Sequence, residues 1–400
     1  MPDAGYRNIP FVVPPPPPEE LPERMPPGDL GRAVRILQRR PHWREATQLD
    51  NVAAYLFMRT EALSSSRMEG TWSTIDNILT PGELYDEGEA KSERQSVRGY
   101  AEALEYGCER VGRLGLAALT TEFVCELHSF IMSKEPDFHG IPGGIRQPGT
   151  PGSIVQIGGP FRKEDSVYNP APPEYVAQCL ESVLSWMGDE IIVEMGNAGM
   201  GMPLPARMAI GHAHFEAVHP FSNGNGRVGR ILWALQMLAD GHLPLYLSGF
   251  IEQHRDQYVQ ALQAAQKRLA YGPIVKLVSE AIIASSSEEA TTKKVIQELP
   301  DLWLQRGKFR KNSAAIRALE VIVKMPILTA GILAEQLQVS VPAATNAVNS
   351  LHRRKILRER TGFRRNRVFA AEEVISVLAR PFGMDPAIAL EASRNTLGIE

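Results

Sequence analysis

The residues of this chain that could carry out chemistry gather in one stretch, His219 to Arg230, which reads HPFSNGNGRVGR. Gly224, Asn225 and Gly226 separate one apolar helical pattern from the next. Glycines before a helix let the backbone approach a ligand closely, and the unpaired amides of the first helical turn point toward it. With the helix dipole, these amides form a site for an anion.

Side chains of the same stretch add positive charge and a proton acceptor. Arg227 and Arg230 lie three positions apart, and arginine can hold phosphate oxygens through two parallel hydrogen bonds. His219 is the residue type best able to take a proton near neutral pH. Pro220 ends the preceding helix, and we expect Phe221 to point into the core and fix the loop. The stretch therefore predicts a polyphosphate site with a general base at its edge.

This stretch resembles the signature of Fic domains, HPFx[D/E]GNGRxxR, at every defined position but one. The resemblance implies transfer of AMP from ATP to a Ser, Thr or Tyr hydroxyl of a protein, the chain itself included. It implies that His219 accepts the hydroxyl proton and that the amides of residues 224–226 stabilise charge at the α-phosphate. Asn225 would orient phosphate oxygens, and Arg227 and Arg230 would hold the β- and γ-phosphates.

Asn223 is the one departure, because the family usually has Asp or Glu there to hold Mg²⁺ between the α- and β-phosphates. Magnesium prefers charged oxygen ligands, and Asn offers one neutral carbonyl oxygen. We therefore expect weak binding of Mg²⁺ or Mn²⁺ at Asn223. Three outcomes stay open: weak metal-dependent transfer, transfer of another phosphate-containing group, or nucleotide binding without turnover.

A second Fic feature lies upstream, at the end of a helical pattern that runs from Asp50 to Glu69. The last residues before Gly70 match the motif [S/T]xxxE[G/N] of the Fic inhibitory helix. The resemblance implies that Glu69 neutralises Arg230, so that ATP binds in a poor geometry. The alternative is a solvated carboxylate at a helix end. In some relatives the same glutamate also supports removal of AMP.

The segment from about 139 to 159 is rich in Gly and Pro and contains a short alternating run. This composition predicts a hairpin rather than a helix. The segment resembles the Fic flap, whose strand edge holds the target protein by strand addition. The expected target-binding residues are Ser153, Ile154, Val155, Gln156 and Ile157.

Histidines in the apolar pattern before this motif raise the question of a metal site. His212, Glu216 and His219 share one helix face, at positions i, i+4 and i+7. The sequence has no HExxH motif and no clear fourth ligand, so we interpret His212 and His214 as helix residues without ligand duty.

The C-terminal part resembles a winged helix-turn-helix domain. Three helical patterns at 311–324, 329–336 and 341–354 precede two short strands within 357–370. Residues 306–369 hold fourteen Lys or Arg and three Asp or Glu, a balance that favours nucleic acid as partner. The alternative is a domain for dimer or partner contacts. Expected at base edges are Thr345, Asn346 and Asn349, and expected at phosphates or the minor groove are Arg353, Arg354, Lys355, Arg364, Arg365 and Arg367.

Length and composition predict a mostly helical protein with several domains. The chain has 400 residues, 44% hydrophobic and 22% charged, which is ordinary for a globular protein. No apolar run approaches the ~20 residues of a membrane span, and no secretory signal starts the chain. The three cysteines lack CxxC spacing, so we expect a reducing, cytoplasmic setting.

The motifs divide the chain into an N-terminal Fic-associated region (1–110, with the inhibitory helix at about 50–69), a Fic core (111–290), a winged helix-turn-helix domain (305–380) and a tail (381–400). The core should be a helical bundle with a β-hairpin flap. Five prolines at 14–18 predict a polyproline arm, either laid on the protein surface or bound by a proline-binding domain. Fic helices commonly self-associate, so a homodimer is expected.

Three functions follow from the sequence. The first is an autoinhibited protein adenylyltransferase. The second is a transcriptional regulator that binds DNA and whose weak Fic domain senses nucleotide. The third is a Fic enzyme that transfers another phosphate-containing group or removes AMP. The intact His219 favours an enzyme, because a nucleotide sensor has no need of a base at this position.

Overall fold

The computed structural model describes residues 10–21, 27–81, 91–158, 166–362 and 366–399. Contacts divide the chain into two compact units, each discontinuous in sequence. Unit 1 comprises Met1–Glu45, Ser64–Trp72 and Gln95–Ser286. Unit 2 comprises Ala46–Leu63, Ser73–Arg94 and Ser287–Glu400.

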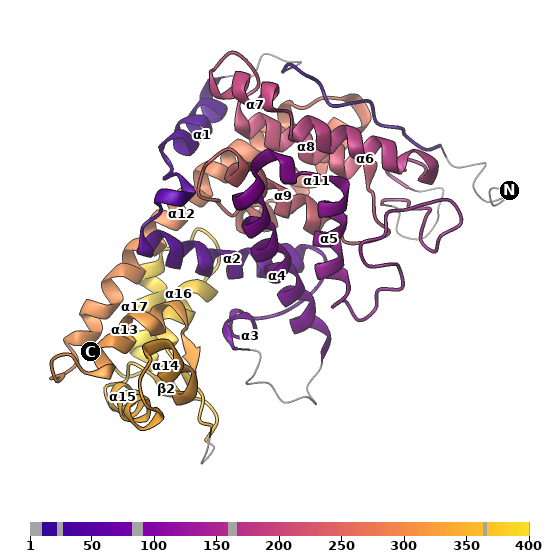
Figure 1. Ribbon diagram of the computed structural model, residues 1–400. Coiled ribbons are helices and arrows are strands. Elements are labelled where there is room, and N and C mark those ends of the chain that lie inside the picture. The colour runs from indigo at the N-terminus through magenta and orange to yellow at the C-terminus, as the bar shows by residue number, and fades with distance from the viewer. Residues whose placement is uncertain (1–9, 22–26, 82–90, 159–165, 363–365, 400) are drawn as a thin grey trace. The chain divides into compact units, whose positions relative to one another are not determined.

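Most helices of both units are labelled in Figure 1. Unit 1 holds α1 (Pro27–Arg39), η2 (Trp43–Glu45), the end of α2 (Gln48–Met68), most of α4 (Lys91–Leu114), η4 (Gly115–Ala118), α5 (Thr121–Met132), α6 (Pro173–Met187), α7 (Glu190–Asn197), α8 (Leu204–Val218), α9 (Asn225–Ala239), α10 (Ser248–Gln253), α11 (Arg255–Arg268) and the start of α12 (Gly272–Leu304). Unit 2 holds the remainder of α2, α4 and α12, with α3 (Ile75–Leu79), α13 (Ala314–Lys324), β1 (Ile327–Leu328), α14 (Ala330–Leu337), α15 (Val341–Arg353), β2 (Arg358–Glu359), β3 (Phe369–Ala370), α16 (Glu372–Ala379) and α17 (Pro386–Thr396).

The centre of unit 1 is the pair α8 and α9, which pack against each other. Every residue of α8 is buried, and α9 is buried over nearly its whole length. A helix that is apolar all round must be enclosed by others, and α6, α11 and α1 also pack on α8. Helix α9 begins at Asn225, directly after Gly224 of the motif.

The helix expected at Asp50–Glu69 is confirmed as α2, which spans Gln48–Met68. Gly70 has φ of +87°, a left-handed conformation that glycine adopts without strain, and it follows the last turn. Thr120 caps α5 by accepting a hydrogen bond from the amide of Phe123. The helices that surround the central pair therefore start and stop where local sequence signals place them.

The segment at 139–158 differs from the expected hairpin. Its described residues form turns, and one isolated antiparallel bridge joins Ile157 to Tyr168. The amide of Ile157 donates to the carbonyl of Tyr168 at 2.8 Å. Pro142, Pro148 and Pro151 lack the N–H that a strand ladder needs, which explains why no strand forms across the segment itself. Gly159 lies outside the described residues.

The proline-rich arm lies along unit 1. The amide of Val12 donates to the carbonyl of Asn169 at 2.9 Å, and the Trp186 indole N–H donates to the carbonyl of Pro18 at 3.0 Å. Because proline carbonyls have no competing amide in the arm, they are free to accept from the underlying helices. These contacts agree with the surface-arm interpretation.

In unit 2, helices α13, α14 and α15 accompany a three-stranded sheet in the order β1-β3-β2. Both strand pairs are antiparallel, with Phe369 opposite Leu328 on one side and Glu359 on the other. Strand β1, which is two residues long, was not expected from the sequence. The segment expected to be a tail contains α17, which packs on α16. Of the described helices, none is both long and apolar enough to cross a membrane.

Candidate functional site

His219 is the C-cap of α8 and has a left-handed backbone, with φ of 50° and ψ of 62°. This conformation is uncommon for a residue with a Cβ and marks a position fixed by its surroundings. The side chain is mostly buried, with 16% of its surface exposed. Burial and the positive charge of Arg146 lower the pKa of His219 to about 3, so the imidazole is neutral at physiological pH.

Arg146 surrounds the backbone of His219 with hydrogen bonds. Its Nε donates to the His219 carbonyl at 2.7 Å, and its Nη2 donates to the Val218 and Ala171 carbonyls at 2.9 and 2.8 Å. Its Nη1 donates to the Ser153 carbonyl at 2.9 Å, and its own amide donates to the Pro220 carbonyl at 2.8 Å. Arg146 is 2% exposed. One buried guanidinium thus joins the end of α8, the start of the proline turn before α6 and the flap.

The loop after His219 is held by Asn225 and His128. The Asn225 side chain accepts from the amide of Phe221 and donates to its carbonyl, both at 2.8 Å. Phe221 is fully buried and stacks on the His128 ring, with centroids 3.8 Å apart. Phe221 therefore points into the core, as expected from the sequence. The prediction that Asn225 orients phosphate oxygens is not supported, because both heteroatoms of this buried side chain bind the loop itself.

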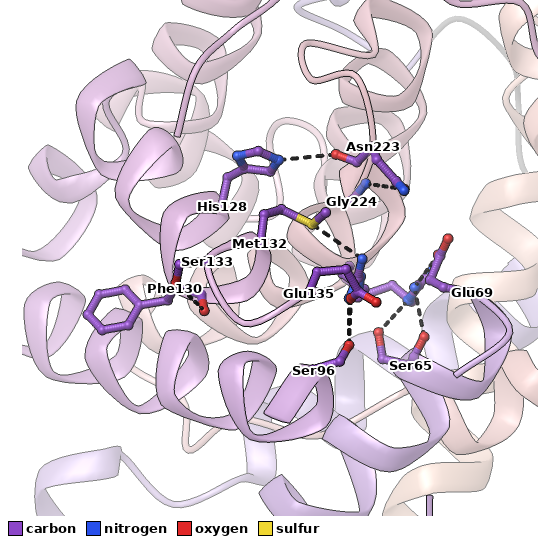
Figure 2. Close-up of polar contacts among 12 residues, drawn as sticks. Ser65, Glu69, Ser96, His128, Phe130, Met132, Ser133, Glu135, Asn223 and Gly224 are labelled. Atoms are coloured by element: carbon purple, nitrogen blue, oxygen red, sulfur yellow. Dashed lines mark hydrogen bonds and ion pairs between the residues drawn. The ribbon is translucent and has the colours of Figure 1, made fainter. Parts of the chain in front are cut away.

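The tautomer of His128 follows from its two partners. Its Nδ1 accepts from the amide of Gly143 at 2.8 Å, so Nε2 carries the proton and donates to the Asn223 carbonyl at 3.1 Å (Figure 2). Burial lowers the pKa of His128 to about 4, which keeps this neutral form at physiological pH. His128 thereby fixes the turn that contains Asn223.

Helix α9 begins directly after this turn. Gly224 has φ of +77°, and a Cβ there would lie 2.7 Å from the Met132 sulfur. A Cβ on Gly226 would lie 2.5 Å from the Glu69 carboxylate. The glycines of the motif therefore bring the chain close to its neighbours at the helix start, where the carboxylate of Glu69 lies beside Gly226.

Arg230 is held by the last turn of α2. Its Nε donates to the Ser65 hydroxyl at 2.7 Å, and its Nη2 donates to the Ser65 carbonyl at 3.0 Å and to the Glu69 carboxylate at 2.7 Å (Figure 2). Arg230 is 2% exposed, whereas the Glu69 side chain is 30% exposed. Partial burial opposes ionisation of Glu69, but the charge of Arg230 outweighs it and lowers the pKa of Glu69 below its ordinary value.

Arg227 points to a different partner. Its Nη1 donates to the Glu135 carboxylate at 2.6 Å and to the Ser96 hydroxyl at 3.0 Å (Figure 2). Arg227 is 2% exposed, and the Ser96 hydroxyl also donates to Glu135 at 2.6 Å. The predicted phosphate contact of Arg227 would require this buried ion pair to open. Both arginines of the motif therefore pair with a carboxylate, Arg227 with Glu135 and Arg230 with Glu69.

Glu216 completes a buried polar cluster behind His219. Its Oε2 lies 3.8 Å from the His219 Nδ1, and Oε1 has no hydrogen-bond partner within the part of the chain that the structure describes. Burial raises the pKa of Glu216 to about 8, against the opposing effect of Arg230. Glu216 therefore holds a proton at neutral pH, so its carboxyl adds no negative charge beside His219.

His212 and His214 contact tyrosines. His212 Nε2 lies 2.7 Å from the Tyr258 hydroxyl, and His214 Nε2 lies 2.8 Å from the Tyr271 hydroxyl. Burial lowers the pKa of His212 to about 3 and that of His214 to about 4. Both rings are neutral and packed, which agrees with their interpretation as helix residues. Among the described residues, no group of three or more His, Cys, Asp or Glu could hold a metal ion.

Asn223 fits a magnesium ion poorly. Its Oδ1 accepts a hydrogen bond from the amide of Gly224 at 2.7 Å, which occupies one of the two lone pairs of this oxygen (Figure 2). The oxygen is also neutral, whereas magnesium favours charged ligands. The motif therefore supplies no strong magnesium ligand at this position.

The expected flap and DNA-binding residues have the following places. Residues 153–157 are partly exposed beside the site, and the Ser153 carbonyl is bound by Arg146.

On α15, Thr345 and Asn346 are exposed, and Asn349 accepts a hydrogen bond from Arg367 at 3.3 Å. Arg367 also pairs with Glu359. Arg353 is exposed, and Lys355 donates a hydrogen bond to the Gly398 carbonyl at 2.7 Å. The Arg354 side chain is held within unit 2 by a hydrogen bond to the Ser350 hydroxyl. Arg364 and Arg365 lie outside the described residues.

Sequence reasoning missed three residues of this site: His128, Glu135 and Arg146. Arg146 lies in the PGGIR run, where a charged residue among Gly and Pro was the available signal. His128 and Glu135 carried no comparable signal, because their partners lie about 90 positions away along the chain.

Comparison with known proteins places this geometry in a family. The model of the Fic/DOC family matches residues 118–237, and the model of the Fic/DOC family N-terminal region matches residues 30–109. The chain therefore contains a Fic domain, with a Fic N-terminal region before it. His219, Arg230 and the start of α9 lie within the first match, and Glu69 lies within the second.

Individual curated relatives match only part of this chain. The chain is 30% identical to a probable protein adenylyltransferase of Aquifex aeolicus (strain VF5) over 112 residues, which are 27% of this chain and 31% of that protein. It is 34% identical to protein adenylyltransferase fic-1 of Caenorhabditis elegans over 98 residues, which are 24% of this chain and 17% of that protein. The chain thus matches less than a third of the length of these curated relatives.

Two solved structures share the fold. A Fic family protein from Desulfovibrio desulfuricans G20 aligns with a TM-score of 0.52 at 18% identity, covering 88% of this chain and 97% of that one. A single-substitution variant of Fic-1 from C. elegans aligns with a TM-score of 0.50 at 21% identity, covering 67% of this chain and 72% of that one. At this identity the likeness establishes a Fic fold.

Proposed function

We propose that this chain is an autoinhibited protein adenylyltransferase that transfers AMP from ATP to a Ser, Thr or Tyr hydroxyl of a protein, itself included. The observation that carries the proposal is the pairing of Glu69 with Arg230 at the start of α9. A carboxylate bound there stands where the phosphates of a nucleotide would bind. The similarity to proteins named adenylyltransferases supports the same reaction.

In the proposed reaction, His219 takes the proton of the target hydroxyl, and the hydroxyl oxygen attacks the α-phosphorus. A P–O bond forms to the target, the bond between the α- and β-phosphates breaks, and pyrophosphate leaves. The amides of residues 224–226 stabilise the charge that develops on the α-phosphate oxygens. The neutral state of the His219 ring leaves one nitrogen able to accept the proton.

Glu69 regulates this reaction through Arg230. While Glu69 holds the guanidinium, Arg230 cannot orient the γ-phosphate, and misplacement of reacting groups by about 1 Å can cost on the order of 10²-fold in rate. The lowered pKa of Glu69 keeps its carboxylate charged at physiological pH, so the contact persists there. Removal of the carboxylate should therefore release transfer.

The test is intact-mass measurement of Glu69→Gly after incubation with ATP and Mg²⁺ or Mn²⁺. We expect an added mass of one AMP per modified chain, well above the wild-type level, and none in the double variant Glu69→Gly, His219→Ala. A folded, ATP-binding Glu69→Gly protein with no added mass would contradict the proposal. Parallel incubations with GTP, CTP and UTP test the rival that another phosphate-containing group is transferred, and incubation of an AMP-modified sample tests removal of AMP.

We propose a second function for unit 2: a winged helix-turn-helix domain that binds DNA. Its support is the order of helices and strands, in which α14 and α15 are joined by a short turn and β3 lies between β1 and β2. The exposed side of α15 presents Thr345 and Asn346. A binding assay with duplex DNA from the region upstream of the gene tests this second proposal.

The predicted homodimer, the protein target and the cytoplasmic setting stay predictions.

A further inference from the structure

Unit 2 contains a pocket of about 570 Å³ that no part of the transfer site uses. It is lined by the loop before α13, by the first turn of α13 and by one side of α15. Ala343 and Ala347 line the α15 wall, and Ala314 and Ala315 line the α13 wall. Small side chains on both walls leave the space open, so the pocket exists because these positions carry alanine.

The side chains that line this pocket include several positive charges and no negative charge. Lys308, Arg310, Lys311 and Arg354 belong to its lining, which contains no Asp or Glu. Lys308, Arg310 and Lys311 are exposed, and their side chains form no ion pair with any residue that the structure describes. Like charges at close range repel one another, and an anion bound among them would relieve that repulsion.

Arg354 is held in one orientation at the edge of the pocket. Its Nη1 donates to the Ser350 carbonyl at 3.0 Å and to the Ser350 hydroxyl at 2.7 Å, and its Nη2 donates to the Lys308 carbonyl at 2.6 Å. The guanidinium also lies over the Phe309 ring, 4.5 Å from its centroid. These contacts fasten the basic loop to α15, so the three exposed cations are held beside this helix.

Asn346 connects the pocket to the exposed side of α15. It lines the pocket and is itself exposed, next to exposed Thr345. A helix that enters the major groove of DNA has phosphates along both of its sides, because the groove is about 12 Å wide. A basic pocket along one side of α15 is therefore placed where a phosphate strand would pass.

We propose that this pocket holds backbone phosphates of duplex DNA while α15 contacts the bases, an inference that rests on the DNA-binding function proposed above. Duplex RNA fits less well, because its major groove is too narrow for side chains of a helix to read. Lys308, Arg310 and Lys311 then supply affinity that does not depend on base sequence, whereas Thr345 and Asn346 face the bases.

The experiment measures binding of the full-length protein to a labelled duplex DNA over a series of salt concentrations. In the triple variant Lys308→Gln, Arg310→Gln, Lys311→Gln, we expect the slope of log K against log salt to become shallower by about 0.9 for each phosphate that the protein no longer neutralises, roughly 2 to 3 in all. The charge-matched control replaces Arg255, Lys267 and Arg268 of unit 1 by Gln, and its slope should equal that of the wild type. Circular dichroism confirms that both variants are folded.

Other outcomes would overturn the inference. If the triple variant keeps the wild-type slope while Asn346→Ala weakens binding, DNA binding stands but the pocket does not hold phosphate. If the wild-type protein binds no duplex DNA even at low salt, both proposals fail. Equal or tighter binding of duplex RNA, or of a poly-glutamate peptide, would show that the pocket serves a different anionic partner.

Discussion

The Nε atom of Arg146 donates a hydrogen bond to the carbonyl oxygen of His219 at 2.7 Å, and the same guanidinium holds the Ser153 carbonyl of the flap. The backbone of the proposed base and the segment expected to hold the target protein therefore share one buried cation. We expect the positions of these two parts to be coupled, so that a change at Arg146 affects transfer more than nucleotide binding.

Arg146→Lys keeps the charge but loses the planar fork that reaches several carbonyls at once. In a Glu69→Gly background we expect self-modification to slow by about 10- to 100-fold, because reacting groups lose their alignment. Affinity for ATP should stay within about twofold, since Arg230 and the α9 amides are untouched. Transfer rate by intact mass and ATP binding by calorimetry give the two values. A parallel loss of ATP binding would contradict the coupling and indicate a disrupted fold.

Asn223→Asp introduces a charged oxygen ligand at the position where the family usually has one. We expect faster transfer and a lower Mg²⁺ concentration for half-maximal rate, again in the Glu69→Gly background. The measurement is a magnesium titration of self-modification, with Asn223→Ala as the matched control. Should the titration midpoint not move, weak metal binding at Asn223 does not limit the reaction.

Glu216→Gln should change how stability depends on pH. The pKa of Glu216 is about 8 when folded and near 4.5 when unfolded, so the folded protein retains a proton that the unfolded chain releases between these values. Wild-type stability should therefore fall by up to about 1.4 kcal/mol per pH unit from pH 4.5 to 8 relative to the variant. Melting temperatures of both proteins across this range test it, and parallel curves would mean that Glu216 is ionised in the folded protein.

His128→Leu should destabilise the loop that precedes α9. It leaves the Gly143 amide and the Asn223 carbonyl without their partner, which costs about 1–3 kcal/mol for each buried group. His128→Gln offers one acceptor and one donor and should lose less. Urea unfolding compares the two variants. Equal losses would show that ring stacking on Phe221, rather than hydrogen bonding, is what His128 contributes.

Local patterns were enough for most helices of unit 1. The bounds of α8 and the end of α2 shortly before Gly70 follow from apolar spacing, proline and glycine, all of which act within a few residues. The flap was less predictable. Its alternating run indicated a strand, but the bridge that does form joins Ile157 to Tyr168, which lies beyond the expected segment.

The sequence by itself determined the chemistry available at this site: a histidine, a turn of glycine and amide residues, two arginines and a glutamate upstream. Only the tertiary structure decided how these are used. In the folded protein Arg230 pairs with Glu69, and Arg227 pairs with Glu135. The Asn225 side chain forms hydrogen bonds with the backbone of Phe221, and Arg146 donates a hydrogen bond to the carbonyl of His219. The physical reason is that a buried donor or acceptor must find a partner wherever the fold brings one, and these partners come from elements far apart in the chain.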